Sequence, residues 1–253
     1  MDKLDEAIIR TQEYGRRYGV EYGKSEIKER LISRTIFKKE EIEKKLGKIS
    51  DVRSQISEKN IKIKKAQKLA DLIGKYFEDI LMIGITGSVA AGYPKKNDDI
   101  DLMIITKKER LWLTRLMLRL LIKFKSIPHR KYGIEEKGDE FCFNLWMEED
   151  LLTLPKERQN LKNAMDSILM IPVLNRNKTY EKFMKENDWI KKYLATAYDM
   201  LEIRFKIHDS RIKHRLITNI LNWLVFWPQY WYMKPKIGDG WVNLKMAFFH
   251  PKK

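Results

Sequence analysis

The chain has 253 residues, of which 51 are Lys or Arg and 35 are Asp or Glu, so its formal net charge is +16 and its isoelectric point is near 9.6. Excess positive charge attracts phosphate-rich partners such as nucleic acid, nucleotides or an anionic membrane surface, although a basic protein without such a partner remains the alternative. The single cysteine, Cys142, excludes an internal disulfide, and we expect a protein of the reducing cytoplasm.

Two further classes of protein are not indicated. The N-terminal residues MDKLDEAIIR are charged from the second position, and no uncharged stretch is long enough to cross a bilayer. We therefore expect neither a cleavable signal nor a transmembrane segment. The four histidines lack the spacing of zinc ligands and have no cysteine partners, which argues against a zinc site. They are His129, His208, His214 and His250.

The N-terminal residues 1–57 read as short helices separated by breakers. We expect one helix over residues 5–13, a second capped by Ser25, and a third over residues 38–46 that ends at Gly47. Three helices of this size suit a small helix-turn-helix or winged-helix module. An ordinary helical cap on the main domain is the alternative.

In the next segment the spacing of apolar residues changes from that of a helix to that of a strand. Apolar residues recur at steps of three and four over residues 58–80, which predicts an amphipathic helix. The lysines of its first turns are expected to be a solvated face, with a nucleic-acid track as the alternative. They are Lys59, Lys62, Lys64, Lys65 and Lys68. Two strands follow, over residues 80–86 and 100–105, separated by Gly87-Ser88, a short helix and a polar loop.

Two aspartates at the start of the second strand are the candidate metal ligands. Side chains alternate along a strand, so Asp99 and Asp101 point to the same face. Neighbouring carboxylates repel unless a cation lies between them, and Mg²⁺ takes one or two carboxylates together with substrate phosphate oxygens. We therefore expect Asp99 and Asp101 to hold Mg²⁺, with Mn²⁺ as the alternative, and Gly87 and Ser88 to approach the phosphates of an NTP. Taken alone, Gly87-Ser88 is more simply interpreted as an ordinary turn, and the two aspartates as the solvated acidic end of a loop.

The order of strand, Gly-Ser, short helix, loop and Asp-x-Asp resembles the nucleotidyltransferase superfamily of the polymerase β type. Asp99 follows Ser88 by eleven residues and Asp101 lies two further on, which looks like the small bacterial members, including antibiotic-modifying and toxin-antitoxin enzymes. This resemblance covers residues 66–150. Over nearly the whole chain, segments such as TGSVAAG, DDIDLMIIT and FCFNLWMEEDLL look like a group of bacterial nucleotidyltransferase-domain proteins of unknown substrate.

The resemblance implies that Gly87 and Ser88 contact the β- and γ-phosphates and that Asp99 and Asp101 ligate the metals. It also implies a third carboxylate on a neighbouring strand, where it helps to activate the attacking hydroxyl in a two-metal arrangement.

The candidate strand for this third carboxylate, residues 140–147, departs from the pattern. Cys142 and Asn144 stand at the expected positions, and neither is a carboxylate. Glu140, one step earlier on the same face, is the candidate substitute. The departure bears on catalysis, which uses the third carboxylate, more than on nucleotide binding.

Basic residues near these motifs are further candidates. We expect residues 107–125 to form a strongly apolar, buried helix. Its basic residues are interpreted as the edge of the helix that faces solvent. The sharper hypothesis is that Arg110, Arg115 or the loop lysines Lys95 and Lys96 neutralise triphosphate charge.

The C-terminal region is helical and aromatic, with one long or two broken helices over residues 199–233. Aromatic residues form a stripe along one side of this helical region, and we expect the stripe to be part of the core, packed on the sheet. The alternatives are a surface for a partner or a membrane interface, and a platform for base stacking. The stripe comprises Trp223, Phe226, Trp227, Tyr230 and Trp231.

The sequence therefore predicts an α+β protein: a nucleotidyltransferase-like core with a short mixed β-sheet over residues 58–155, an N-terminal helical module over 1–57 and a C-terminal helical region over 156–253. The predicted function is Mg²⁺-dependent transfer of a nucleoside monophosphate from an NTP to a hydroxyl or similar acceptor. The alternative is a catalytically degenerate relative that binds nucleotide and nucleic acid as a sensor or regulator. The acceptor (RNA or DNA, a protein or a small molecule), the preferred base and the oligomeric state stay open.

Overall fold

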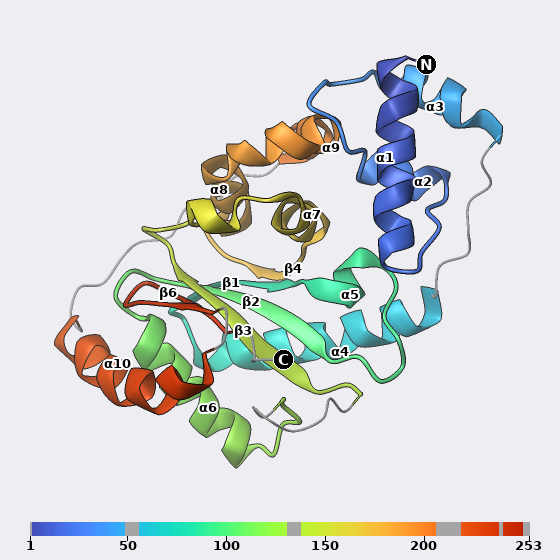
Figure 1. The fold of residues 1–253 in the computed structure, drawn as a ribbon. Helices are drawn as coiled ribbons and strands as arrows, with labels where there is room; N and C mark the ends of the chain where they lie inside the picture. Colours follow the sequence, from blue (N-terminus) through green and yellow to red (C-terminus); the bar gives the residue numbers. More distant parts are fainter. Residues whose placement is uncertain (1, 49–55, 131–137, 206–218, 238–239, 250–253) are drawn as a thin grey trace. The chain divides into compact units, whose positions relative to one another are not determined.

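A computed structural model of the protein describes residues 2–48, 56–130, 138–205, 219–237 and 240–249. Over these residues the protein is α+β, as predicted, and its helices accompany a six-stranded mixed sheet (Figure 1). The chain divides into two compact units, which are described separately. The first comprises Met1–Ser54, Leu154–Leu169 and Met184–His208, and the second comprises Gln55–Thr153, Met170–Phe183 and Asp209–Lys253. The three-part division predicted from the sequence stays a prediction.

The first unit is helical within the described residues. Its helices are α1 (Lys3–Arg17), α2 (Lys24–Glu29), α3 (Lys39–Lys45), α7 (Leu161–Leu169) and α9 (Lys191–Phe205), with short 3₁₀ turns at Leu46–Lys48, Lys156–Arg158 and Asp188–Ile190. Asp2 caps α1, because its Oδ1 accepts hydrogen bonds from the backbone amides of Leu4 and Asp5 at 3.0 and 2.8 Å. The residue before α2 is Gly23, so the predicted capping by Ser25 is wrong.

The second unit is built on the sheet, whose strand order is β4-β1-β2-β3-β6-β5. The strands are β1 (Ile80–Ile85), β2 (Ile100–Thr106), β3 (Phe141–Glu148), β4 (Ile171–Asn175), β5 (Trp241–Val242) and β6 (Met246–Phe248). β2 and β3 are parallel, and the other neighbouring pairs are antiparallel. The two strands predicted around Gly87-Ser88 are therefore confirmed as β1 and β2.

The remaining helices are α4 (Ile56–Tyr76), α5 (Gly87–Ala91), α6 (Leu111–Phe124), α8 (Thr179–Glu186) and α10 (Asn219–Met233), followed by a 3₁₀ turn at Lys234–Lys236. α6 connects the parallel strands β2 and β3, as such a crossover requires. Glu148 at the end of β3 fixes the start of α6, because its Oε1 accepts from the amides of Arg110 and Leu111 at 3.1 Å each.

One face of the sheet carries the hydrophobic core of this unit. The alternate β2 residues Ile100, Leu102 and Ile104 are buried in one cluster with α4 and α6. Asp101 lies between them in sequence, so its side chain points to the opposite face. The alternation predicted for this strand is thus confirmed.

The aromatic stripe of α10 is only partly core. Phe226 is buried against Trp112 of α6, with ring centroids 4.9 Å apart. Trp223, Trp227 and Trp231 are exposed, so for these three residues the core interpretation is wrong. Residues 206–218, in the middle of the predicted helical stretch, lie outside the described residues.

Candidate metal centre

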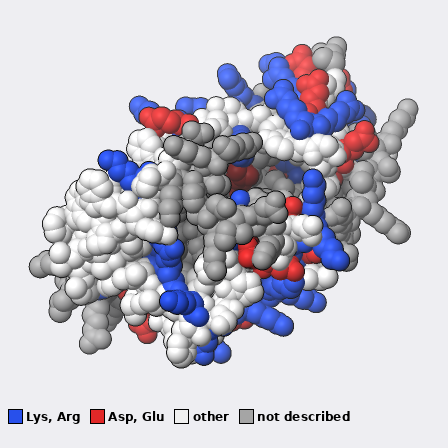
Figure 2. Space-filling model, turned by 60° about the horizontal axis from the view of Figure 1, so that its bottom comes forward, with Lys and Arg blue, Asp and Glu red and all other residues white. Residues whose placement is uncertain are grey.

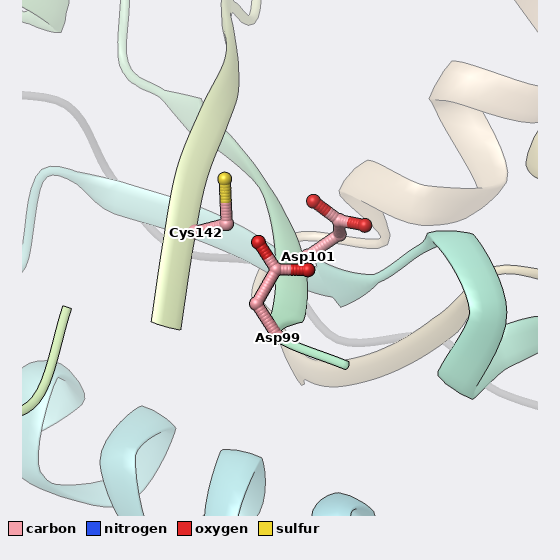
Figure 3. A group of neighbouring side chains, drawn as sticks. All are labelled: Asp99, Asp101 and Cys142. Carbon is pink, nitrogen blue, oxygen red and sulfur yellow. The ribbon is translucent and has the colours of Figure 1, made fainter. Parts of the chain in front are cut away.

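The site lies where β2 begins. Asp99 directly precedes the strand, Asp101 is its second residue, and Cys142 of β3 is the register partner of Asp101. Ligand atoms from these three side chains, two carboxylate oxygens and the Cys142 sulfur, all lie within 4.8 Å of one another (Figure 3). The two aspartates predicted to share a face are therefore brought together, and the group could hold a metal ion.

The pKa values of Asp101 and Cys142 determine which of these side chains is suited to bind a metal. Burial, and then the neighbouring Asp99, raise the pKa of Asp101 to about 6. Burial, and then the two carboxylates, raise the pKa of the Cys142 thiol far above its ordinary value. The thiolate is the metal-binding form of cysteine, so a thiol held in its neutral form is a poor ligand. The carboxylate oxygens are therefore the more suitable candidate ligands of this group, and carboxylate oxygen is the ligand type that hard cations prefer.

Two further side chains bind the carboxylates. Arg130 donates from Nη1 to Asp99 Oδ2 at 2.8 Å, and Asn144 donates from Nδ2 to Asp101 Oδ1 at 3.0 Å. Asn144 Oδ1 is buried and has no hydrogen-bond partner in the described part of the chain. Sequence reasoning missed Arg130, because a single arginine in a loop far from Asp99 in sequence carries no pattern. The aspartates thus each have a polar partner from the segment that leads into or forms β3.

Gly87 brings the backbone directly against the site. Its φ is +64°, a conformation that favours glycine, and a Cβ at this position would collide with Asp101 Oδ2. The backbone amide of Thr86, immediately before it, donates to the carbonyl oxygen of Asp101 at 2.9 Å. The backbone at Gly87 therefore lies directly against the Asp101 carboxylate, and whether Gly87 and Ser88 contact phosphates stays a prediction.

A buried lysine supports the loop before Asp99. Lys62 of α4 is fully buried, and its Nζ donates to the carbonyl oxygens of Lys96 and Asp98 at 3.3 and 2.8 Å. It also pairs with Asp139 Oδ1 at 3.2 Å. The prediction that Lys62 belongs to a solvated lysine face is therefore wrong. Its contacts give it a positioning role, because they connect α4 to the loop that ends at Asp99.

The other predicted site residues are placed differently. Glu140 precedes β3 and its carbonyl oxygen accepts from the Ile100 amide at 2.8 Å, but its carboxylate is not in the metal-ligand group found among the described residues. Lys95 is exposed on the loop, where its backbone amide donates to Asp98 Oδ2 at 3.0 Å. Whether either side chain takes part in binding or catalysis stays a prediction.

Arg115 lies between α6 and α10. Its Nη1 donates to Gln229 Oε1 at 2.6 Å, and its guanidinium lies 4.6 Å from the ring centroid of Phe249. Burial, and then the charge of Arg119, lower the pKa of Arg115 to about 9. These contacts give Arg115 a packing role, and the structure shows no contact between it and the two aspartates.

Comparison with known proteins adds no assignment. No family model matches the chain, and no curated protein or solved structure is significantly similar to it. Among the described helices, none combines the length and the apolar character that crossing a membrane requires. Any function assigned to the chain therefore depends on the site geometry described above.

Proposed function

We propose that the chain is a nucleotidyltransferase that moves a nucleoside monophosphate from an NTP to a hydroxyl or similar acceptor. One observation supports it most: the Gly87-Ser88 turn lies against Asp101 at the point where Asp99 and Asp101 converge. A glycine backbone that approaches one of two converging carboxylates is suited to a metal-bound triphosphate, because the metal takes its remaining ligands from phosphate oxygens. In this proposal the second unit has a nucleotidyltransferase-like core.

The reaction would be an in-line displacement. The acceptor oxygen bonds to the α-phosphorus while the bond from that phosphorus to pyrophosphate breaks, and the acceptor's proton passes to solvent. A bound Mg²⁺ or Mn²⁺ would supply the positive charge that offsets the triphosphate and the leaving pyrophosphate. Asp99 and Asp101 would hold that ion, Gly87 and Ser88 would seat the phosphates, and the exposed Lys95 is available to the leaving pyrophosphate.

The charge of the chain bears on the class of acceptor. The net charge of +16 favours a nucleic acid, or a protein bound to nucleic acid, over a neutral small molecule. The helical first unit would then contact the nucleic acid, as a helix-turn-helix or winged-helix module does.

The test is label transfer with purified protein, each of the four NTPs labelled at the α-phosphate, Mg²⁺ or Mn²⁺, and cellular RNA or protein as acceptor. Asp101→Asn is the matched control, since it removes one charge at nearly constant volume. Label that moves to an acceptor with the wild type alone supports the proposal and identifies the acceptor class. If no nucleotide and no metal gives transfer, the proposal is rejected.

A second candidate function is nucleotide binding without transfer. It is favoured by the residues opposite Asp101 on β3, because Cys142 and Asn144 occupy the positions where a third carboxylate would activate the acceptor. Asn144→Asp restores a carboxylate there, with Asn144→Ala as its control. If the wild type binds NTP without transfer and Asn144→Asp gains transfer, the second candidate holds for the wild type.

A further inference from the structure

The outer face of α10 carries no charge. Residues 219–233 include no Asp, Glu, Lys or Arg, although the helix exposes about half of its side chains. Helices on the surface of soluble proteins normally place charged or polar residues on the solvent side. The exposed residues of α10 are instead apolar or aromatic, with Trp223 50% and Trp231 60% exposed. They are Leu221, Trp223, Leu224, Trp227, Pro228, Trp231 and Tyr232.

The neighbouring helix α6 extends this surface. α6 packs along α10 through the hydrogen bond from Arg115 to Gln229 and through the amide of Trp112, which donates to Asn222 Oδ1 at 2.9 Å. The exposed apolar residues of α6 are Met117, Leu120 and Phe124, the last of which is 82% exposed, and Arg119 and Lys123 are exposed beside them. We call the ten exposed apolar or aromatic side chains of α6 and α10 the aromatic face. In Figure 2 the left part of the molecule is mostly white, with Lys, Arg and a few Asp or Glu side chains at its borders.

Lysines border the aromatic face at the ends of both helices. Lys125 Nζ lies 5.9 Å from the ring centroid of Phe124, and Lys234 Nζ lies 5.1 Å from that of Trp231. An uncharged apolar helix face with basic residues at its ends complements a lipid surface that is apolar below and negatively charged at the headgroups.

The aromatic residues distinguish lipid from a protein partner. Trp and Tyr are enriched at the membrane–water interface, where the ring is buried and its N–H or O–H stays hydrated. The aromatic face has three exposed Trp side chains at four-residue steps and one Tyr, and the exposed charged residues of α6 beside it, Arg119 and Lys123, are both basic. We propose that the aromatic face docks on an anionic lipid bilayer, lying in the interface without crossing it.

The experiment is vesicle flotation of the full chain with neutral phosphatidylcholine vesicles and with vesicles that also contain phosphatidylglycerol. We expect at least tenfold stronger binding to the anionic vesicles, and a loss of most of that difference in 0.5 M salt. Binding of equal strength to both vesicles would overturn the charge argument, and absence of binding to either would overturn the proposal.

Variants locate the binding surface. Trp223→Ser with Trp231→Ser should weaken binding to anionic vesicles at least fivefold, whereas Ile36→Ser and Tyr76→Ser, both 58% exposed elsewhere, should not change it. Brominated lipids give a second readout that needs no variant, because they quench tryptophans at the depth of the bromine atoms. Quenching should be strong in the wild type and small in the double variant. A concentration-dependent dimer that the same double variant abolishes, without vesicle binding, would assign the face to a second copy of the chain and overturn the proposal.

Discussion

The ammonium group of Lys62 donates a hydrogen bond to the carbonyl oxygen of Asp98, the residue immediately before Asp99, at 2.8 Å. A fully buried cation on α4 thereby holds the end of the loop that delivers the first carboxylate to the site. Lys62 lies 37 positions before Asp99 in the sequence. A substitution of Lys62 therefore tests how Asp99 is positioned without changing a candidate ligand.

Lys62→Met should weaken both the fold and the site. The substitution keeps most of the side-chain volume but removes the donor that the carbonyl oxygens of Lys96 and Asp98 share, and a hydrogen bond from a charged group contributes about 1.5–3 kcal/mol. We expect a lower urea midpoint and weaker Mn²⁺ binding by calorimetry. Lys65→Met is the control, since Lys65 is 42% exposed and pairs with the same Asp139. Equal effects of the two substitutions would contradict a specific role for Lys62.

Arg130→Gln should tighten metal binding in the absence of nucleotide. The guanidinium of Arg130 is a cation on Asp99 Oδ2, so it competes with a metal for that oxygen. Removing it should raise Mn²⁺ affinity about tenfold, which corresponds to about 1.4 kcal/mol. Electron paramagnetic resonance of free Mn²⁺ measures this directly, with Arg119→Gln, an exposed charge on α6, as the control. Unchanged or weaker binding in Arg130→Gln would show that Arg130 supports the ligand geometry instead.

Gly87→Ala should abolish metal binding. The new Cβ would collide with Asp101 Oδ2, and the residue would in addition have to adopt a φ of +64°. The control is Gly19→Ala, because Gly19 has a φ of +72° but open space where the Cβ would lie. Gly19→Ala should lose only the cost of the backbone conformation, about 1 kcal/mol. Melting temperatures and Mn²⁺ titrations of both variants separate the backbone cost from the collision, and retained metal binding in Gly87→Ala would refute the close approach.

Asp166→Asn should stabilise the protein near neutral pH. Burial raises the pKa of Asp166 on α7 to about 6, so the folded state binds its proton more tightly than the unfolded state does. The wild type should therefore lose stability as pH rises from about 4 to about 6, by up to about 2 kcal/mol, and the loss persists above that range. The advantage of the variant should shrink toward zero near pH 4. Urea unfolding of the wild type, Asp166→Asn and the exposed control Asp188→Asn across this range checks the sign.

The sequence predicted the part of the site that is local in the chain. β1, the Gly87 turn and β2 lie within 27 consecutive residues, and their alternation and small residues are directly visible. Lys62, Arg130 and Asn144 reach the same site from other segments, and their contacts depend on strand pairing and helix packing. A buried lysine among four other lysines has no signature of its own, because burial is decided by the loop that covers it.

The exposed tryptophans of α10 differ from the predicted core for a related reason. Periodicity identifies residues that share a helix face, but it does not say which face meets the sheet. Phe226 and Asn222 face α6, while Trp223 and Trp227 lie on the other side. Large aromatic residues are most often core, so a core interpretation follows from composition unless the packing is known.

The alternation of side chains along β2 also determines what attachment to a bilayer would leave open. Ile100, Leu102 and Ile104 face the helix layer that includes α6, whereas Asp101 points away from it. A chain resting on lipid through α6 and α10 would hold these helices between the bilayer and its sheet. Its Asp101 carboxylate would then lie on the side of the sheet that faces away from the lipid, so that in the proposed reaction the nucleotide would bind on the aqueous side.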